Sequence, residues 1–131
     1  MFEAVCVVLM LFVPQAGTSA ALPDTPQGKH LRAYIDAFNT GDEKKYLAMM
    51  EEHMEPGLLK RRPVEERAKM FQRMRGDFGT LTVSQVINAS ADQIQLGIPD
   101  KEGTIATFTF RFEATMPFRI SSMSVEIDHG G

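Results

Sequence analysis

Apolar residues recur at helical spacing through the first half of the chain. Between residues 26 and 39 they occupy one face of a predicted helix: Leu31, Tyr34, Ile35 and Phe38. A second amphipathic stretch covers residues 43–54, and a third begins at Pro63 and stops before Gly79. Proline in a first turn and glycine after a last turn are typical helix boundaries. The pattern therefore predicts three helices, with "EPGLLKRR" as a linker before the third.

After Gly79 the apolar period changes to two, which is typical of strands with one buried face. The alternation runs through "TLTVSQVI", "DQIQLGI", "TIATFTFRF" and "FRISSMSVEI", with "PDKEG" and "MPF" as turns. In the last segment the alternation slips at Ser121-Ser122, where a β-bulge would supply one extra residue. The prediction is an α+β domain: three N-terminal helices packed on a curved antiparallel four-stranded sheet.

The inward positions of these strands carry no ionisable side chain. They are Leu81, Val83, Ile94, Leu96, Ile98, Ala106, Phe108, Phe110 and Phe112. Three phenylalanines on one strand would fill the space between sheet and helices. We expect the following residues to line whatever pocket remains: Tyr34, Phe38, Met70, Phe71, Met74, Phe108, Phe110 and Phe112.

The N-terminus differs from the rest of the chain. "AVCVVLMLFV" is a short apolar run followed by small residues, which predicts a signal peptide over residues 1–20. The run is shorter than the roughly 20 apolar residues that span a bilayer, so no stable span is expected after cleavage. A buried N-terminal segment is the alternative. Residues 21–27 then form a Pro-rich lead-in, residues 28–128 form the domain, and the protein is expected to be secreted or periplasmic.

Length and charge narrow the function classes. The 131 residues suit one domain, and a net charge of −3 gives no reason to expect nucleic acid as a partner. Cys6 is the only cysteine and lies in the predicted signal peptide, so the mature chain has no thiol for catalysis or metal binding. "EEHMEP" places His53 beside glutamates without the spacing of a zinc site. We expect no metal and no cofactor.

The order of these elements, together with "YIDAFNTGD", resembles the nuclear transport factor 2-like superfamily, also called SnoaL-like or ketosteroid-isomerase-like. Its first helix commonly ends in an aromatic residue, Asn, a small residue, Gly and Asp, which here are residues 38–42. "RRPVEERAKMFQRMRGDFG" and "VINASADQIQL" resemble a small secreted subgroup, some of it found beside secreted serine hydrolases and peptidases. The resemblance covers essentially all of the mature chain. The chain lacks the extra strands that the family inserts between its helices.

The resemblance implies a cone-like, cystatin-like roll with a pocket between helices and sheet, and often a homodimer through the outer sheet face. Thr107, Thr109 and Arg111 would lie at that interface. Enzymes of the superfamily place Asp, His or Tyr inside the cone, so His30, Tyr34 and Tyr46 are the catalytic candidates. Each also has a purely structural interpretation: an exposed first-turn histidine and two core tyrosines.

Seven of the 14 Lys and Arg residues fall between positions 60 and 75. They are Lys60, Arg61, Arg62, Arg67, Lys69, Arg73 and Arg75. Such a helix usually presents a solvated face, and a binding patch for an acidic partner is the alternative.

The sequence and the resemblance lead to two main functional hypotheses. The first is a secreted non-catalytic module that binds a small apolar ligand or a protein partner and is accessory to extracytoplasmic hydrolases. The second is a small lyase or isomerase that acts on an apolar substrate in the cone pocket. An open pocket of about 300 Å³ or more, with His30 or a tyrosine pointing inside, would favour the enzyme. A space filled by the phenylalanines of the third strand would favour the binding module.

Overall fold

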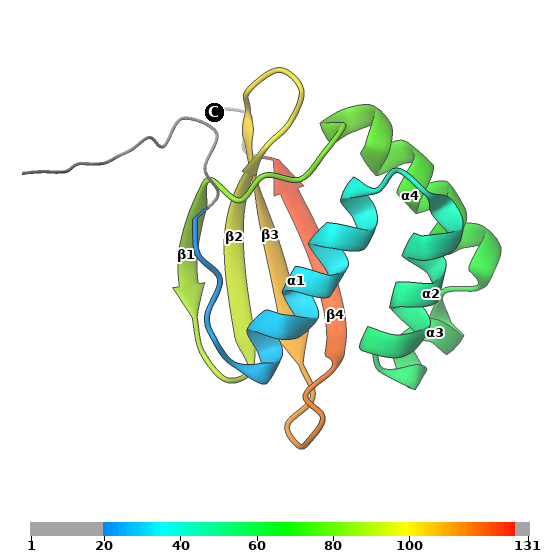
Figure 1. Ribbon diagram of the computed structural model, residues 1–131, viewed down its shortest axis with the longest axis vertical. Coiled ribbons are helices and arrows are strands. Elements are labelled where there is room, and N and C mark those ends of the chain that lie inside the picture. Colours follow the sequence, from blue (N-terminus) through cyan, green and yellow to red (C-terminus); the bar gives the residue numbers. More distant parts are fainter. Residues whose placement is uncertain (1–19, 128–131) are drawn as a thin grey trace, which may run out of the picture.

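The computed structural model describes residues 20–127, which form four helices followed by four strands (Figure 1). The helices are α1 (Pro26–Asn39), α2 (Glu43–His53), α3 (Pro56–Arg61) and α4 (Val64–Phe78). The strands are β1 (Gln85–Ala89), β2 (Gln93–Pro99), β3 (Ile105–Phe112) and β4 (Ile120–Ile127). The α+β class is therefore confirmed. The predicted signal peptide lies outside the described residues, apart from Ala20.

The prediction of three helices was wrong, because the segment interpreted as a linker contains α3. Pro56 occupies the first turn of this helix, and the backbone amides of Leu58 and Leu59 donate to the carbonyl of Glu55. Lys60 and Arg61 lie in its last turn, where positive charge is favourable. Six residues make fewer than two turns, so the segment is too short to show an apolar period.

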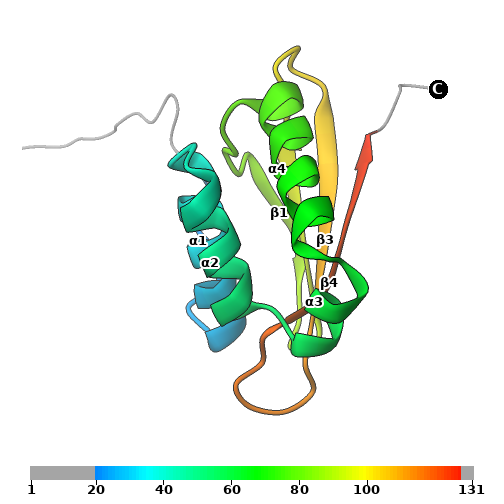
Figure 2. The same cartoon turned by 90° about the vertical axis from the view of Figure 1, so that its right-hand side faces the viewer.

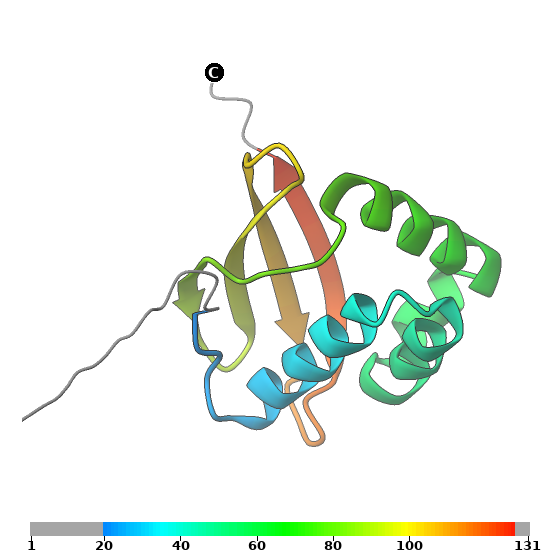
Figure 3. The same ribbon diagram turned by 45° about the horizontal axis from the view of Figure 1, so that its top comes forward.

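The strands form one antiparallel sheet in the order β1-β2-β3-β4. The helices lie on one side of it, and within the described part of the chain no helix covers the other face (Figures 2 and 3). The sheet is open and is not strongly curled. Its central pair is regular from Gln93–Arg111 to Pro99–Ile105, and the register shifts fall where β1 and β4 pair with it. The sheet is therefore less curved than the sequence predicts, although register shifts are present at its edge strands.

The predicted bulge in the last strand is confirmed. Arg111 pairs with Ser122 and Phe112 pairs with Ile120, so Ser121 is the extra residue of β4. The bulge lets Ile120 and Met123, three positions apart, pair with Phe112 and Phe110 on the inner face of β3.

Asn39, the last residue of α1, has a structural role that explains its place in the "YIDAFNTGD" motif. Its side chain donates from Nδ2 to the carbonyl oxygen of Leu81 over 2.9 Å and accepts from the Leu81 amide over 2.7 Å. The amide side chain thus pairs with a buried residue ahead of β1 as a neighbouring strand would. β1 itself begins at Gln85, later than predicted, because the backbone of residues 80–84 contacts Asn39 and Ala20 as well as β2.

The predicted break between the first two helices is also confirmed. Gly41 has a φ of +75°, a conformation that is unstrained only for glycine. Asp42 then caps α2, because its Oδ1 accepts from the amides of Lys44 and Lys45.

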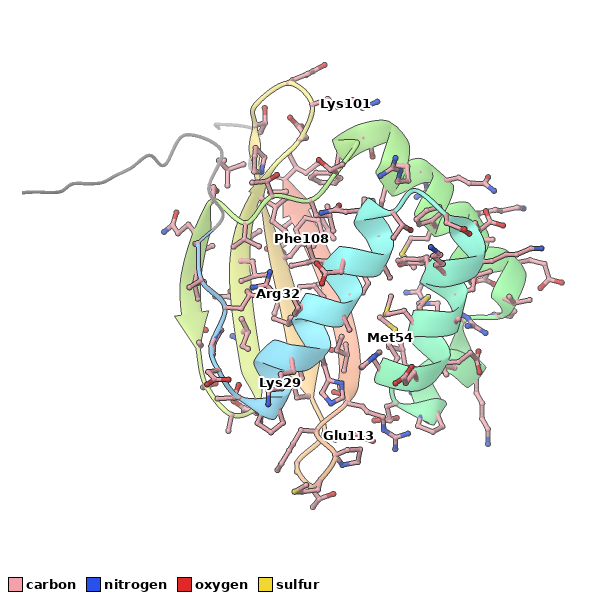
Figure 4. All side chains as sticks on the ribbon, viewed as in Figure 1. Lys29, Arg32, Met54, Lys101, Phe108 and Glu113 are labelled. Carbon is pink, nitrogen blue, oxygen red and sulfur yellow. The ribbon has the colours of Figure 1, made fainter. Side chains whose placement is uncertain are left out.

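The core lies between the helices and the inner sheet face. Phe108 is fully buried between β3 and the helices, and Figure 4 shows it beside α1. Its ring packs edge to face against the ring of Phe78, with 5.3 Å between the ring centroids. The rings of Phe110 and Tyr34 pack in the same way, with their centroids 5.5 Å apart. Burial of each such side chain contributes about 1.5–3 kcal/mol.

Candidate functional site

Two of the three catalytic candidates, Tyr34 and Tyr46, are buried in the core. The hydroxyl oxygens of Tyr34 and Tyr46 are 3.1 Å apart, and both side chains are completely buried. Burial raises the pKa of Tyr34 well above its usual value, and the neighbouring Tyr46 raises it further. Burial also raises the pKa of Tyr46, although the hydrogen bond to Tyr34 and the charge of Arg67 partly offset this. Both phenols are therefore protonated at neutral pH and are poor general bases.

The third candidate, His30, pairs with another histidine. Its Nδ1 lies 2.9 Å from Nδ1 of His53, and its Nε2 lies 2.8 Å from the carbonyl oxygen of Pro117. A carbonyl only accepts, so Nε2 of His30 carries the proton. In the neutral pair His53 therefore donates from Nδ1 to Nδ1 of His30. Both histidines are half-buried, so His30 is not the exposed first-turn histidine of the structural interpretation.

The histidine pair connects three segments of the fold. It joins α1, α2 and the connection between β3 and β4, and Figure 4 labels Glu113 in that connection. Burial lowers the pKa of His53, and the charge of Glu52 opposes this. Nε2 of His53 lies 3.8 Å from a carboxylate oxygen of Glu52. Both imidazole rings therefore have a structural role, because their hydrogen bond joins α1 to α2.

The phenylalanines of β3 fill the inner face of the sheet. Phe108 and Phe110 have no exposed surface and Phe112 has 6%. The other predicted pocket residues, Tyr34, Phe38, Phe71 and Met74, are buried in the same core. Met70 differs, because it lies half-buried at the wall of a cavity.

That cavity has a volume of about 60 Å³ and lies between α2, α3, α4 and β4. Methionines dominate its wall, and Met54 is labelled beside α2 in Figure 4. The lining residues are Tyr46, Met50, Met54, Leu58, Arg62, Arg67, Met70 and Met123. The lining contains no carboxylate and no histidine, so it offers apolar contact and positive charge.

Arg67 is the charged residue that sequence reasoning misplaced. It was predicted on a solvated basic face, yet it is only 6% exposed. Its Nε donates to the Arg62 carbonyl over 2.8 Å, and its Nη1 donates to Glu51 over 2.9 Å. One signal could have found it: Arg67 precedes Phe71 by four residues and Met74 by seven, which places it on the buried face of α4.

Apart from Arg62, the rest of the basic segment lies outside the cavity lining. An open groove of about 200 Å³ follows the exposed side of α4, and it shares Arg62 and Met70 with the cavity. Glu66, Lys69 and Arg73 complete its lining. The cavity and the groove are therefore adjacent.

The predicted interface residues lie on the outer sheet face. Thr107, Thr109 and Arg111 pair with Glu126, Ser124 and Ser122 of β4. Nε2 of Gln95 donates to the Thr109 hydroxyl over 3.2 Å, so the face is polar around Thr109. Arg111 is exposed.

Residues 20–127 contain no group of three or more His, Cys, Asp or Glu side chains placed to hold a metal ion. None of the helices in that range combines the length and apolar character needed to cross a membrane. No protein-family model matches this chain, and no curated protein or solved structure matches it either.

Proposed function

We propose that this protein is a secreted, non-catalytic binding module that holds a small apolar ligand in the methionine-lined cavity. The observation that carries the proposal is the chemistry of the lining. Methionine side chains are flexible and polarisable, and they suit contacts with varied apolar groups. A binding role needs no acid–base group, and the one phenol in the wall is a protonated, hydrogen-bonded tyrosine.

The resemblance to the nuclear transport factor 2-like superfamily supplies the context of the proposal. The cone of that fold would here be reduced to helices on an open sheet, with the pocket displaced toward α3 and β4. In this proposal the protein is secreted or periplasmic, forms a homodimer through Thr107, Thr109 and Arg111, and is accessory to an extracytoplasmic hydrolase. The apolar N-terminal run supports secretion, and the outer sheet face is left uncovered by the helices of residues 20–127, as the homodimer requires (Figure 2). The association with a hydrolase rests on the resemblance alone.

The alternative, a small lyase or isomerase, has less support. Its candidate residues would be His30, Tyr34 and Tyr46, yet the tyrosines bond to each other and His30 bonds to His53. The cavity of about 60 Å³ is also well below the open pocket of about 300 Å³ or more that would have favoured the enzyme, so only a slender ligand is proposed for it.

The proposal is tested by titration with 1-hexanol, an uncharged slender probe. In protein labelled at the methionine methyl groups, the NMR signals of Met50, Met54, Met70 and Met123 should shift saturably. The signal of Met49, which is buried on α2 but outside the lining, should stay in place.

A matched pair of variants provides the control. Leu58→Phe adds volume at the cavity wall and should abolish the hexanol shifts, whereas Leu47→Phe, at a half-buried position outside the lining, should leave them. Circular dichroism verifies that both variants fold. Absence of saturable shifts in the wild type, or equal shifts in both variants, would overturn the proposal.

A further inference from the structure

We infer that the ligand of the methionine-lined cavity is a slender amphiphile with a carboxylate head, and that Arg67 binds this head. The inference rests on the proposed function and adds the chemical class of the ligand. Its starting point is the position of a cation. Arg67 is 94% buried and lines a cavity whose other residues are mostly apolar.

The hydrogen bonds of Arg67 leave part of its guanidinium available. Nε is occupied by the Arg62 carbonyl and Nη1 by Glu51. Within residues 20–127, Nη2 has no hydrogen-bond partner. A buried donor without a partner costs about 1–3 kcal/mol, and more when it is charged. A carboxylate oxygen from a ligand in the cavity would remove that cost.

The two existing contacts also hold the guanidinium in place. Glu51 and the Arg62 carbonyl bind Arg67 from α2 and from the residue after α3. Glu51 remains 63% exposed at its side chain, so its charge is largely solvated. A ligand head would therefore meet an arginine whose orientation is already fixed, which reduces the entropic cost of binding.

The adjacent groove extends the positive potential. Arg62, Lys69 and Arg73 line it, with Glu66 as the opposing charge. Arg62 and Met70 belong to both the groove and the cavity. An anion is thus attracted at the surface and reaches Arg67 beside the apolar wall.

The volume restricts the shape of the ligand. The cavity is less than half of the roughly 150 Å³ that holds benzene in an engineered apolar cavity. A straight alkyl chain has a narrower cross-section than a ring, so it can enter such a space end-on while the flexible methionines move to admit the rest of it. A planar carboxylate also matches the guanidinium fork, which favours it over a rounder anion.

Three C6 probes of equal chain length test the inference by calorimetry at low salt: hexanoate, 1-hexanol and hexylammonium. We expect hexanoate to bind at least about tenfold more tightly than hexanol, as a hydrogen bond to a charged group provides. Hexylammonium should bind more weakly than hexanol. Equal affinity for hexanoate and hexanol would overturn the carboxylate inference but leave the proposed function intact, whereas binding of none of them would overturn both.

Substitutions at Arg67 test whether the carboxylate head of the ligand binds there. Arg67→Met should abolish the advantage of hexanoate over hexanol while hexanol still binds, and Arg67→Lys should keep part of it. Arg32→Met, at an exposed position on α1 outside the cavity lining, is the control and should behave like the wild type. If Arg67→Met fails to fold, Arg67→Lys and the wild-type ranking of the three probes still decide the question. A full hexanoate advantage in either folded Arg67 variant would overturn the inference.

Discussion

The hydroxyl oxygens of Tyr34 and Tyr46 lie 3.1 Å apart where α1 packs on α2, and neither side chain reaches solvent. Tyr34→Phe should destabilise the protein by about 1–3 kcal/mol, because it leaves the Tyr46 hydroxyl buried without its partner. The double variant Tyr34→Phe/Tyr46→Phe should lose much less than the sum of the single variants. Urea unfolding of all three measures this coupling, and additive losses would show that the hydroxyl pair is not a unit.

The stability of the protein should be equally sensitive to a change of one side-chain atom at Asn39. Asn39→Asp keeps the acceptor for the Leu81 amide but places an oxygen against the Leu81 carbonyl, so we expect a loss of about 1–3 kcal/mol. Protonation of the new carboxyl at acidic pH restores a donor and should recover part of the loss relative to wild type. Urea unfolding at pH 7 and pH 4 measures both effects.

Asn88→Asp is the matched control for that substitution, because Asn88 is exposed and donates only to the side chain of Gln95. Its effect at pH 7 should stay within about 0.5 kcal/mol, as for most surface substitutions. If the two variants were equally stable at pH 7, the double hydrogen bond of Asn39 would have no special role.

The sequence predicted the elements with long apolar periods well, because burial on one face imposes those periods. The bulge at Ser121 was readable for the same reason, since one extra residue inverts the alternation. α3 was missed because six residues are too few for a period. The curvature of the sheet could not be predicted, because it depends on how the edge strands pair. The alternation along one strand does not show how that strand pairs with its neighbours.

The candidate site was harder to predict than the fold. The phenylalanines of β3 were expected to fill the space inside the sheet, and they lie in the core. The cavity depends on Leu58 in the missed helix and on Met123 beyond the bulge, which come together only in three dimensions. Arg67 was assigned to the surface because charged residues seldom lie fully buried. Its contacts with Glu51 and Arg62 explain why it is an exception.

His53 should make folding stability depend on pH. Its pKa is lowered in the folded protein, so the unfolded chain binds more protons between that value and the unfolded pKa of about 6.5. The contribution of His53 is therefore fully present above pH 6.5 and is lost as the pH falls toward the folded pKa. Thermal unfolding between pH 7.5 and pH 5 should show this fall in wild type and a flatter profile in His53→Gln. An unchanged profile in the variant would assign the dependence to other groups.

Two helical glycines should respond to alanine in opposite directions. A Cβ at Gly28 would clash with the backbone oxygen of Pro23, so Gly28→Ala must displace the lead-in from α1. We expect a loss of about 1–3 kcal/mol, typical of overpacking. A Cβ at Gly76, on the exposed side of α4, would have no atom within 4 Å, and alanine there should stabilise the helix by up to about 1 kcal/mol. Urea unfolding compares the two variants. If Gly28→Ala were as stable as Gly76→Ala, residues 21–25 would not be packed against α1 in solution.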